Sequence, residues 1–166
     1  MRKMTEDNLK AAFAGESQAH MRYLIFADRA DREGKPNVAR LFRAISFAEQ
    51  IHATKHFRTL AEIKDTSQNL QAAISGETYE VEEMYPVFKA VAELQEEKQA
   101  VQANDWALQA EMVHAGMYTQ AKQAVDAGRD VSLGDVFICD VCGHTTETLP
   151  DKCPLCGAKK ESYRKF

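Results

Sequence analysis

The sequence reads Glu-Gln-Ile-His at residues 49–52 and Glu-Met-Val-His at residues 111–114. Both tetrapeptides lie in stretches that are poor in glycine and proline and rich in Ala, Glu, Gln and Leu, which is the composition of long helices. On a helix, residues i and i+3 project on the same side, so a carboxylate oxygen and an imidazole nitrogen can reach one metal ion. One such tetrapeptide is common by chance, but two of them predict a metal site.

A glutamate precedes each tetrapeptide by nearly the same distance. Glu16 lies 33 residues before Glu49, and Glu77 lies 34 residues before Glu111. All four fall on the apolar stripes of their helices, where an unpartnered carboxylate costs several kcal/mol unless cations neutralise it. Any one of them could instead lie at the edge of its stripe and reach solvent. As a set, these glutamates and the two histidines form the ligand pattern already known from ferritin-like di-iron carboxylate bundles.

The rest of residues 5–127 predicts a bundle of four helices. Residues 33–37 form a Gly- and Pro-containing turn between the first two helices, and Thr66 or Ser67 would cap the third. Apolar residues recur at steps of three and four, so one face of each helix is expected to be buried in a common core. The predicted helices cover residues 5–32, 37–64, 67–94 and 96–127. Residues predicted to lie in the core include Leu41, Ile45, Ile63, Val87, Phe88, Val91, Leu94 and Met112.

The chain contains an internal repeat with one irregular step. Glu49 and Glu111 are 62 residues apart, and so are Tyr23 and Tyr85, but Glu16 and Glu77 are only 61 apart. The repeat predicts two copies of a helical hairpin that place two metal ions about a pseudo-twofold axis. The extra residue falls between Glu77 and Tyr85. It predicts a π-helical turn there, because single insertions of this kind cluster at functional sites.

Other acidic and imidazole side chains lie close to the predicted ligands. Glu80 has no counterpart in the first repeat, and it adds a fifth carboxylate one turn beyond the predicted glutamate ligand of its helix. It could also be a supporting or solvated acid, which is the interpretation we give to Glu82 and Glu83. His20 and His56 are interpreted as core or supporting residues, because both metal ions already have ligands.

All four cysteines lie near the C-terminus, as Cys-Asp-Val-Cys at 139–142 and Cys-Pro-Leu-Cys at 153–156. Two such knuckles have the spacing of a tetrahedral four-thiolate metal site, and so small a segment needs a metal to stabilise it. Iron and zinc fit this ligand set equally well. A zinc site would be structural, whereas an iron site would carry one electron.

Charge and hydropathy exclude several classes of protein. The net charge of −4 at pH 7 does not suggest a protein that binds nucleic acid or a membrane surface. No apolar run approaches the ~18 residues that suggest a membrane span. The N-terminus lacks the apolar segment of a secretory signal, so a cytoplasmic location is expected.

Taken in order, these motifs resemble the rubrerythrin family along the whole chain. The resemblance rests on Ala-Gly-Glu-Ser-Gln-Ala at 14–19, Gly-Glu-Thr-Tyr-Glu at 76–80, Met-Tyr-Pro at 84–86, the two Glu-x-x-His pairs and the two cysteine knuckles. It implies a mainly α protein, with a ferritin-like four-helix bundle over residues 1–133 and a small rubredoxin-like domain over residues 134–166.

The resemblance also implies which residues hold metal. Two non-haem iron ions, bridged by carboxylate and oxide, would be held by Glu16, Glu49, His52, Glu77, Glu80, Glu111 and His114. One Fe(Cys)4 centre would be held by Cys139, Cys142, Cys153 and Cys156. Zinc is an alternative occupant of these sites.

The implied activity is reduction of hydrogen peroxide to water, with electrons supplied by an NAD(P)H-dependent reductase or a rubredoxin. One iron would exchange His52 for Glu80 between oxidation states. Tyr23 and Tyr85 would hydrogen-bond the ligand carboxylates and donate protons, although both could be ordinary core tyrosines. Two other interpretations stay open: a ferroxidase or iron-storage protein of the ferritin class, and a metal-buffering bundle with a structural zinc ribbon.

The link between the second and third helices predicts a homodimer. A ferritin-like crossover must traverse helices of about 40 Å, at about 1.5 Å per residue, and the four to twelve residues available hardly reach that far even when extended. We therefore expect a domain swap, in which hairpins 5–64 and 67–127 of different chains form each bundle.

Overall fold

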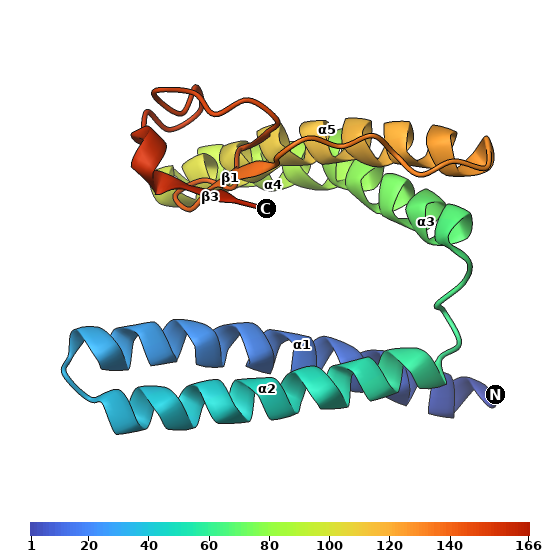
Figure 1. Ribbon diagram of the computed structural model, residues 1–166. Coiled ribbons are helices and arrows are strands. Elements are labelled where there is room, and N and C mark those ends of the chain that lie inside the picture. The colour runs from blue at the N-terminus through green and yellow to red at the C-terminus, as the bar shows by residue number, and fades with distance from the viewer. The chain divides into compact units, whose positions relative to one another are not determined.

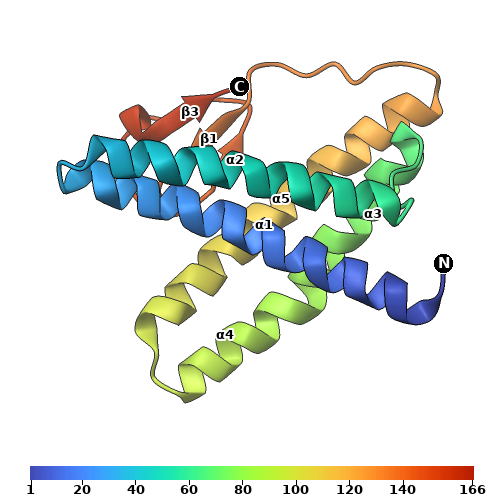
Figure 2. The same ribbon diagram turned by 90° about the horizontal axis from the view of Figure 1, so that it is seen from below.

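The computed structural model describes residues 1–166, which divide into two compact units, residues 1–64 and 65–166. The first unit is a hairpin of α1 (Lys3–Arg32) and α2 (Pro36–Thr59), which lie side by side in Figures 1 and 2. None of the helices in the chain is long and apolar enough to cross a membrane.

Helix α2 ends earlier than residue 64, where the sequence pattern predicts its end. It stops at Thr59, and Ala61 adopts a left-handed conformation with φ of 55°. A left-handed residue just beyond the last turn ends a helix, and no glycine marks this position in the sequence. The link to the next helix therefore comprises residues 60–65.

The second unit opens with one continuous helical segment in three parts, α3 (Thr66–Tyr79), the π turn η1 (Glu80–Met84) and α4 (Tyr85–Leu94). The predicted π turn is thereby confirmed. The π turn ends two residues before Pro86. Pro86 has no N–H to donate to the preceding turn, so a widened turn there costs little regular hydrogen bonding. Helix α5 (Lys98–Asp126) returns alongside.

The predicted cap of α3 is wrong by one or two residues. Asp65 caps the helix, because its carboxylate oxygen accepts a hydrogen bond from the backbone N–H of Gln68 at 2.8 Å. Thr66 is the first residue of the helix, not its cap. Asp, Thr and Ser can all cap a helix, so the sequence alone did not distinguish Asp65 from its neighbours Thr66 and Ser67.

The residues that the hairpins bury fully are mostly small, and many of their large apolar residues are exposed. Ala27, Ala30 and Ala39 are buried where α1 meets α2, and Ala92 and Ala110 are buried in the second unit. The predicted core stripes are not covered within this chain's own hairpins, since Leu41 is 60% exposed and Leu94 is 84% exposed. The other exposed stripe residues are Ile45, Ile63, Val87, Phe88, Val91 and Met112. A hairpin covers only one side of each helix, so the outer stripe needs a further partner.

The C-terminal part is a small three-stranded sheet with strand order β2-β1-β3. Strand β1 (Phe137–Cys139) pairs antiparallel with β2 (Thr145–Thr146) and with β3 (Tyr163–Lys165), and a short 3-10 turn (Lys160–Ser162) precedes β3. Its buried residues are Cys139, Thr145 and Cys153. Two of these three are cysteines, so the thiol cluster occupies the place of a hydrophobic core.

Candidate metal centre

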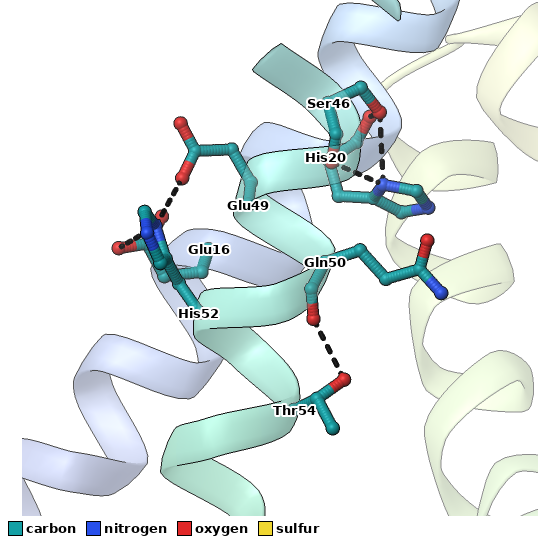
Figure 3. A network of polar contacts seen from close by, with 7 residues as sticks. All are labelled: Glu16, His20, Ser46, Glu49, Gln50, His52 and Thr54. Carbon is teal, nitrogen blue, oxygen red and sulfur yellow. Dashed lines mark hydrogen bonds and ion pairs between the residues drawn. The ribbon is translucent and has the colours of Figure 1, made fainter. Parts of the chain in front are cut away.

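The first half-site joins α1 to α2. Glu16 of α1 and Glu49 and His52 of α2 point toward one another in Figure 3, and their donor atoms all lie within 4.8 Å of one another. The Nδ1 atom of His52 is 2.9 Å from a carboxylate oxygen of Glu49 and 4.0 Å from one of Glu16. Both glutamate side chains are partly buried, with 32% of Glu16 and 16% of Glu49 exposed.

The second half-site repeats the first within the other unit. Glu77 of α3 and Glu111 and His114 of α5 also bring their donor atoms within 4.8 Å of one another. The Nδ1 atom of His114 is 2.5 Å from a carboxylate oxygen of Glu111. In both half-sites, therefore, the imidazole turns Nδ1 toward the carboxylates.

The electrostatics of Glu77 fit a cation site. Burial, a hydrogen bond with Glu111 and the charges of Glu111 and Glu80 together raise the pKa of Glu77 to about 7. Glu77 therefore retains a proton up to near neutral pH, and a bound cation would replace that proton. Two carboxylates and one imidazole are oxygen and nitrogen ligands that suit non-haem iron. The structure thus brings each predicted trio together in a form that fits the metal, and the ligand role of each residue stays a prediction.

The raised pKa of Glu77 predicts how the stability of the metal-free protein depends on pH. The folded pKa lies above the ordinary value of 4.5, so the stabilising protonated form is fully present below about 4.5 and is lost as the pH rises through about 7. The melting temperature of the metal-free protein should fall between pH 5 and pH 8. The fall should be smaller in Glu77→Gln, with Glu82→Gln as the exposed control, in melting curves followed by helix signal. Equal slopes in wild type and Glu77→Gln would contradict this assignment.

Glu80 lies beside the second half-site. It is the first residue of the π turn, and burial together with the charge of Glu111 raises its pKa, while His114 acts in the opposite direction. Glu82 and Glu83 of the same turn are exposed, as expected for solvated acids. The π turn thus sets Glu80 apart from its acidic neighbours.

The two predicted catalytic tyrosines differ in their surroundings. The ring of Tyr23 packs against Phe26 and Phe42. Burial raises the pKa of Tyr85, and the charges of Glu80, Glu111 and Glu77 raise it further. Tyr85 is therefore close to the predicted ligands of its own unit, and the catalytic role of both tyrosines stays a prediction.

His20 has a structural partner in α2. Its Nδ1 atom lies 2.9 Å from the hydroxyl and 3.0 Å from the backbone oxygen of Ser46, and that hydroxyl donates to the backbone oxygen of His20. Figure 3 shows this pair on a different side of the hairpin from Glu16 and His52. Ser46 is fully buried, so the contact ties α1 to α2 and supports the interpretation of His20 as a core residue.

The four cysteines form a second cluster, made by two knuckles of matching geometry. In each knuckle the backbone N–H of the glycine after the second cysteine, Gly143 or Gly157, donates to the oxygen of the first cysteine at 2.9 Å. Both glycines have left-handed φ angles, 78° and 76°, which a glycine adopts without strain.

The positions of the sulfur atoms fit tetrahedral coordination of a metal ion. The Sγ atoms of Cys139 and Cys156 are 3.7 Å apart, and those of Cys142 and Cys153 are 3.5 Å apart. A tetrahedron with metal–sulfur bonds of about 2.3 Å has edges of about 3.8 Å. Burial opposes ionisation of Cys153, yet hydrogen bonds from the Tyr163 hydroxyl and from backbone amides bring its pKa down to about 6. A thiolate is thus favoured at Cys153, as metal binding requires, while burial raises the pKa of Cys142 and of Cys156.

Sequence models of two families match these two parts of the chain. The model described as Rubrerythrin matches residues 7–122, and the model described as the rubredoxin-like domain of rubrerythrin matches residues 137–164. The chain belongs to the rubrerythrin family. Rubrerythrin-2 of Clostridium acetobutylicum is 42% identical to it in an alignment 178 positions long, which covers 98% of this chain and 97% of the relative.

Nigerythrin of Nitratidesulfovibrio vulgaris is 35% identical to this rubrerythrin, over 98% of this chain and 86% of the relative. The solved structure of fully reduced nigerythrin is 33% identical, with a TM-score of 0.57 over 98% of this chain and 86% of that one. As a rubrerythrin, the chain combines a ferritin-like fold and a di-iron site with a rubredoxin-like Fe(Cys)4 site. Rubrerythrins are oxidoreductases, generally of the peroxidase type, that act in oxidative stress.

Proposed function

We propose that this rubrerythrin reduces hydrogen peroxide to water, with electrons that pass from an NAD(P)H-dependent reductase or a rubredoxin through the four-cysteine iron site. The observation that carries the proposal is the presence in one chain of carboxylate–imidazole half-sites and a four-thiolate cluster. The oxygen and nitrogen ligands suit iron that meets an oxidant, and the thiolate site suits one-electron transfer. Iron storage alone would leave the thiolate site without a role.

The side chains around the second half-site can supply the protons that the reaction needs. When bound, a pair of ferrous ions supplies both electrons for cleavage of the O–O bond. Each peroxide also takes up two protons to give two water molecules. Tyr85 retains its proton at neutral pH, because burial and the charges of Glu80 and Glu111 raise its pKa, and we assign it as a proton donor. Tyr23 is its proposed counterpart in the first repeat.

We assign Glu80 a role that depends on oxidation state. Glu80 would bind the oxidised site, and His52 would take its place in the reduced site, because an anionic oxygen ligand suits ferric iron better than an imidazole does. The position of Glu80 in the π turn beside Glu111 supports the proposal.

Glu80→Ala should separate metal binding from turnover. The variant should retain its iron content, since the other predicted ligands are intact, while peroxide turnover falls by about 10- to 100-fold. Iron analysis and steady-state peroxidase assays would measure the two effects. Glu83→Ala, which removes an exposed acid from the same turn, is the matched control. Unchanged peroxidase kinetics in Glu80→Ala would refute the role.

A single anaerobic experiment tests the proposed reaction. The iron-loaded protein is reduced, which bleaches the red ferric tetrathiolate, and hydrogen peroxide is then added. The red absorbance should return as electrons leave the thiolate site, and NAD(P)H should be consumed once the reductase is present. A thiolate site that stays colourless because it contains zinc, or that stays reduced while peroxide is consumed, would contradict the proposal.

We further propose that the active protein is a domain-swapped homodimer. Residues 60–65 span at most about 20 Å, whereas the 24 residues of α2 measure about 36 Å. A ferritin-like crossover along the helices is therefore out of reach of this link. The exposed apolar stripe of each hairpin, which includes Leu41 and Leu94, supports the proposal that a hairpin of a second chain covers it.

We also propose a domain boundary between residues 133 and 134 and a cytoplasmic location. The two family matches end at residue 122 and resume at residue 137, on either side of the proposed boundary. The four cysteines are free thiols at metal-binding distances, which suits a reducing compartment.

A further inference from the structure

A side chain of the rubredoxin-like sheet contacts a predicted ligand of the di-iron site. The hydroxyl oxygen of Thr145, on β2, lies 2.8 Å from Nε2 of His114, on α5. Thr145 is only 3% exposed, and both residues belong to the second compact unit. This contact is therefore a partly buried hydrogen bond between the rubredoxin-like sheet and a predicted ligand of the di-iron site within one chain.

The other contacts of these two residues decide where the protons lie. The Thr145 hydroxyl has one proton, and it donates to the backbone oxygen of Gly143 at 3.1 Å. With a metal ion on Nδ1, the one ring proton of His114 would lie on Nε2, and the Thr145 oxygen would accept it. Without metal, the 2.5 Å contact between Nδ1 and Glu111 contains a proton, and a metal ion bound at Nδ1 would replace that proton.

The same hydrogen bonds connect the two metal sites. Gly143 follows Cys142 directly in the chain, so covalent bonds lead from a thiolate ligand to the carbonyl that accepts from Thr145. From there, two hydrogen bonds reach the His114 ring. In the first half-site, by contrast, His52 is 56% exposed, and its Nδ1 atom faces Glu49 and Glu16.

We propose that Thr145 is a positioning residue, which fixes His114 for metal binding through Nδ1 and makes the second half-site the entry point for electrons from the four-cysteine site. The electron part rests on the proposed function. The ferrous tetrathiolate gives up one electron and becomes ferric, and an external one-electron donor, a rubredoxin or a reductase, restores it. Two such one-electron transfers replace the two electrons that the di-iron site gives to each peroxide. The peroxide also takes up two protons and forms two water molecules.

The first test needs no enzyme activity. In full-length protein loaded with redox-inert zinc at both sites, 15N NMR of the histidine rings should place the His114 proton on Nε2 and show slow exchange with solvent. Thr145→Val, which is close in shape, should speed that exchange by about 10-fold or more, and Thr145→Ser should restore slow exchange. Thr146→Val, on the same strand with a partly exposed side chain, is the control. A proton on Nδ1 in the wild-type protein would overturn the proposal without any variant.

The second test follows electrons in the iron-loaded protein. After anaerobic reduction and addition of peroxide, return of the red absorbance should be about 10-fold slower in Thr145→Val than in wild type or Thr145→Ser. An unchanged rate, together with the altered NMR exchange, would overturn the electron entry point. Failure of the wild-type protein itself to reoxidise would instead reject the proposed function, and the NMR result would still decide the positioning role.

Discussion

Two variants that are each inactive should recover about half of the wild-type peroxidase activity when they are combined in one dimer. Glu49→Ala damages the half-site of the first hairpin, and Glu111→Ala damages that of the second. In a domain-swapped pair, each bundle takes its two hairpins from different chains. One bundle of the mixed dimer then receives both intact hairpins, and the other receives both damaged ones. Half of the sites are complete, although neither variant alone forms any.

The measurement uses two affinity tags and co-expression. Tandem purification isolates the mixed dimers, and iron content and peroxide turnover are compared with those of each parent dimer. Since a complete site either forms or does not form, the expected change is from near zero to about one half. Sedimentation at micromolar concentration checks that the species is a dimer. A strictly monomeric protein would exclude the swap at once.

A reciprocal combination distinguishes a swapped dimer from an unswapped one. A chain that carries both substitutions is paired with a wild-type chain. In a swapped dimer every bundle then contains one damaged hairpin, so the mixed dimer should be inactive. In an unswapped dimer the wild-type chain retains its own complete site, and half of the activity remains. Mixed dimers that show this second pattern would refute the swap while leaving the peroxidase proposal intact.

Cys153→Ser should unfold the C-terminal domain and leave the helices folded. The strands there are only two or three residues long, and two of the three buried residues of the domain are cysteines. Metal binding at sites of this kind is worth about 10–16 kcal/mol at neutral pH, far more than so small an apolar core can supply. We expect loss of one metal ion per chain, loss of the red absorbance and loss of backbone NMR dispersion for residues 137–165.

Val141→Ala provides the control, because Val141 lies in the other knuckle of the same domain and is 52% exposed. It should retain the metal ion and the dispersed spectrum. Helix content measured by circular dichroism should stay nearly unchanged in both variants, since α1 to α5 precede the domain. A Cys153→Ser protein with a well-dispersed C-terminal spectrum would show that the sheet folds without its metal.

Features that depend on spacing could be predicted from the sequence. The Glu-x-x-His pattern and the repeat predict the three members of each half-site, and the structure brings each trio within 4.8 Å. The π turn followed from a difference of one residue between two repeat distances. Because a helix repeats about every 3.6 residues, the number of residues between two side chains determines whether they lie on the same face of the helix.

Features that depend on local backbone geometry or on long-range contacts could not be predicted in this way. The end of α2 depends on the left-handed conformation of Ala61, which its residue type does not indicate. The exposure of Leu41 and Leu94 depends on which other helices cover them, and periodicity does not report that. Thr145 lies 31 residues from His114 and has no recognisable spacing to it, so only the folded structure reveals their contact.

The π turn explains how a duplicated hairpin can lose its symmetry without losing its fold. One added residue in a regular helix rotates everything beyond it by about 100° and would turn the stripe of α4 away from α5. The widened turn absorbs the addition, so the flanking helices stay in place while Glu80 takes a position with no equivalent in the first copy. A protein built from two copies of the first hairpin would hold two chemically equivalent ions. With Glu80 in the ligand role that we propose, a single insertion suffices to make the two metal positions chemically different.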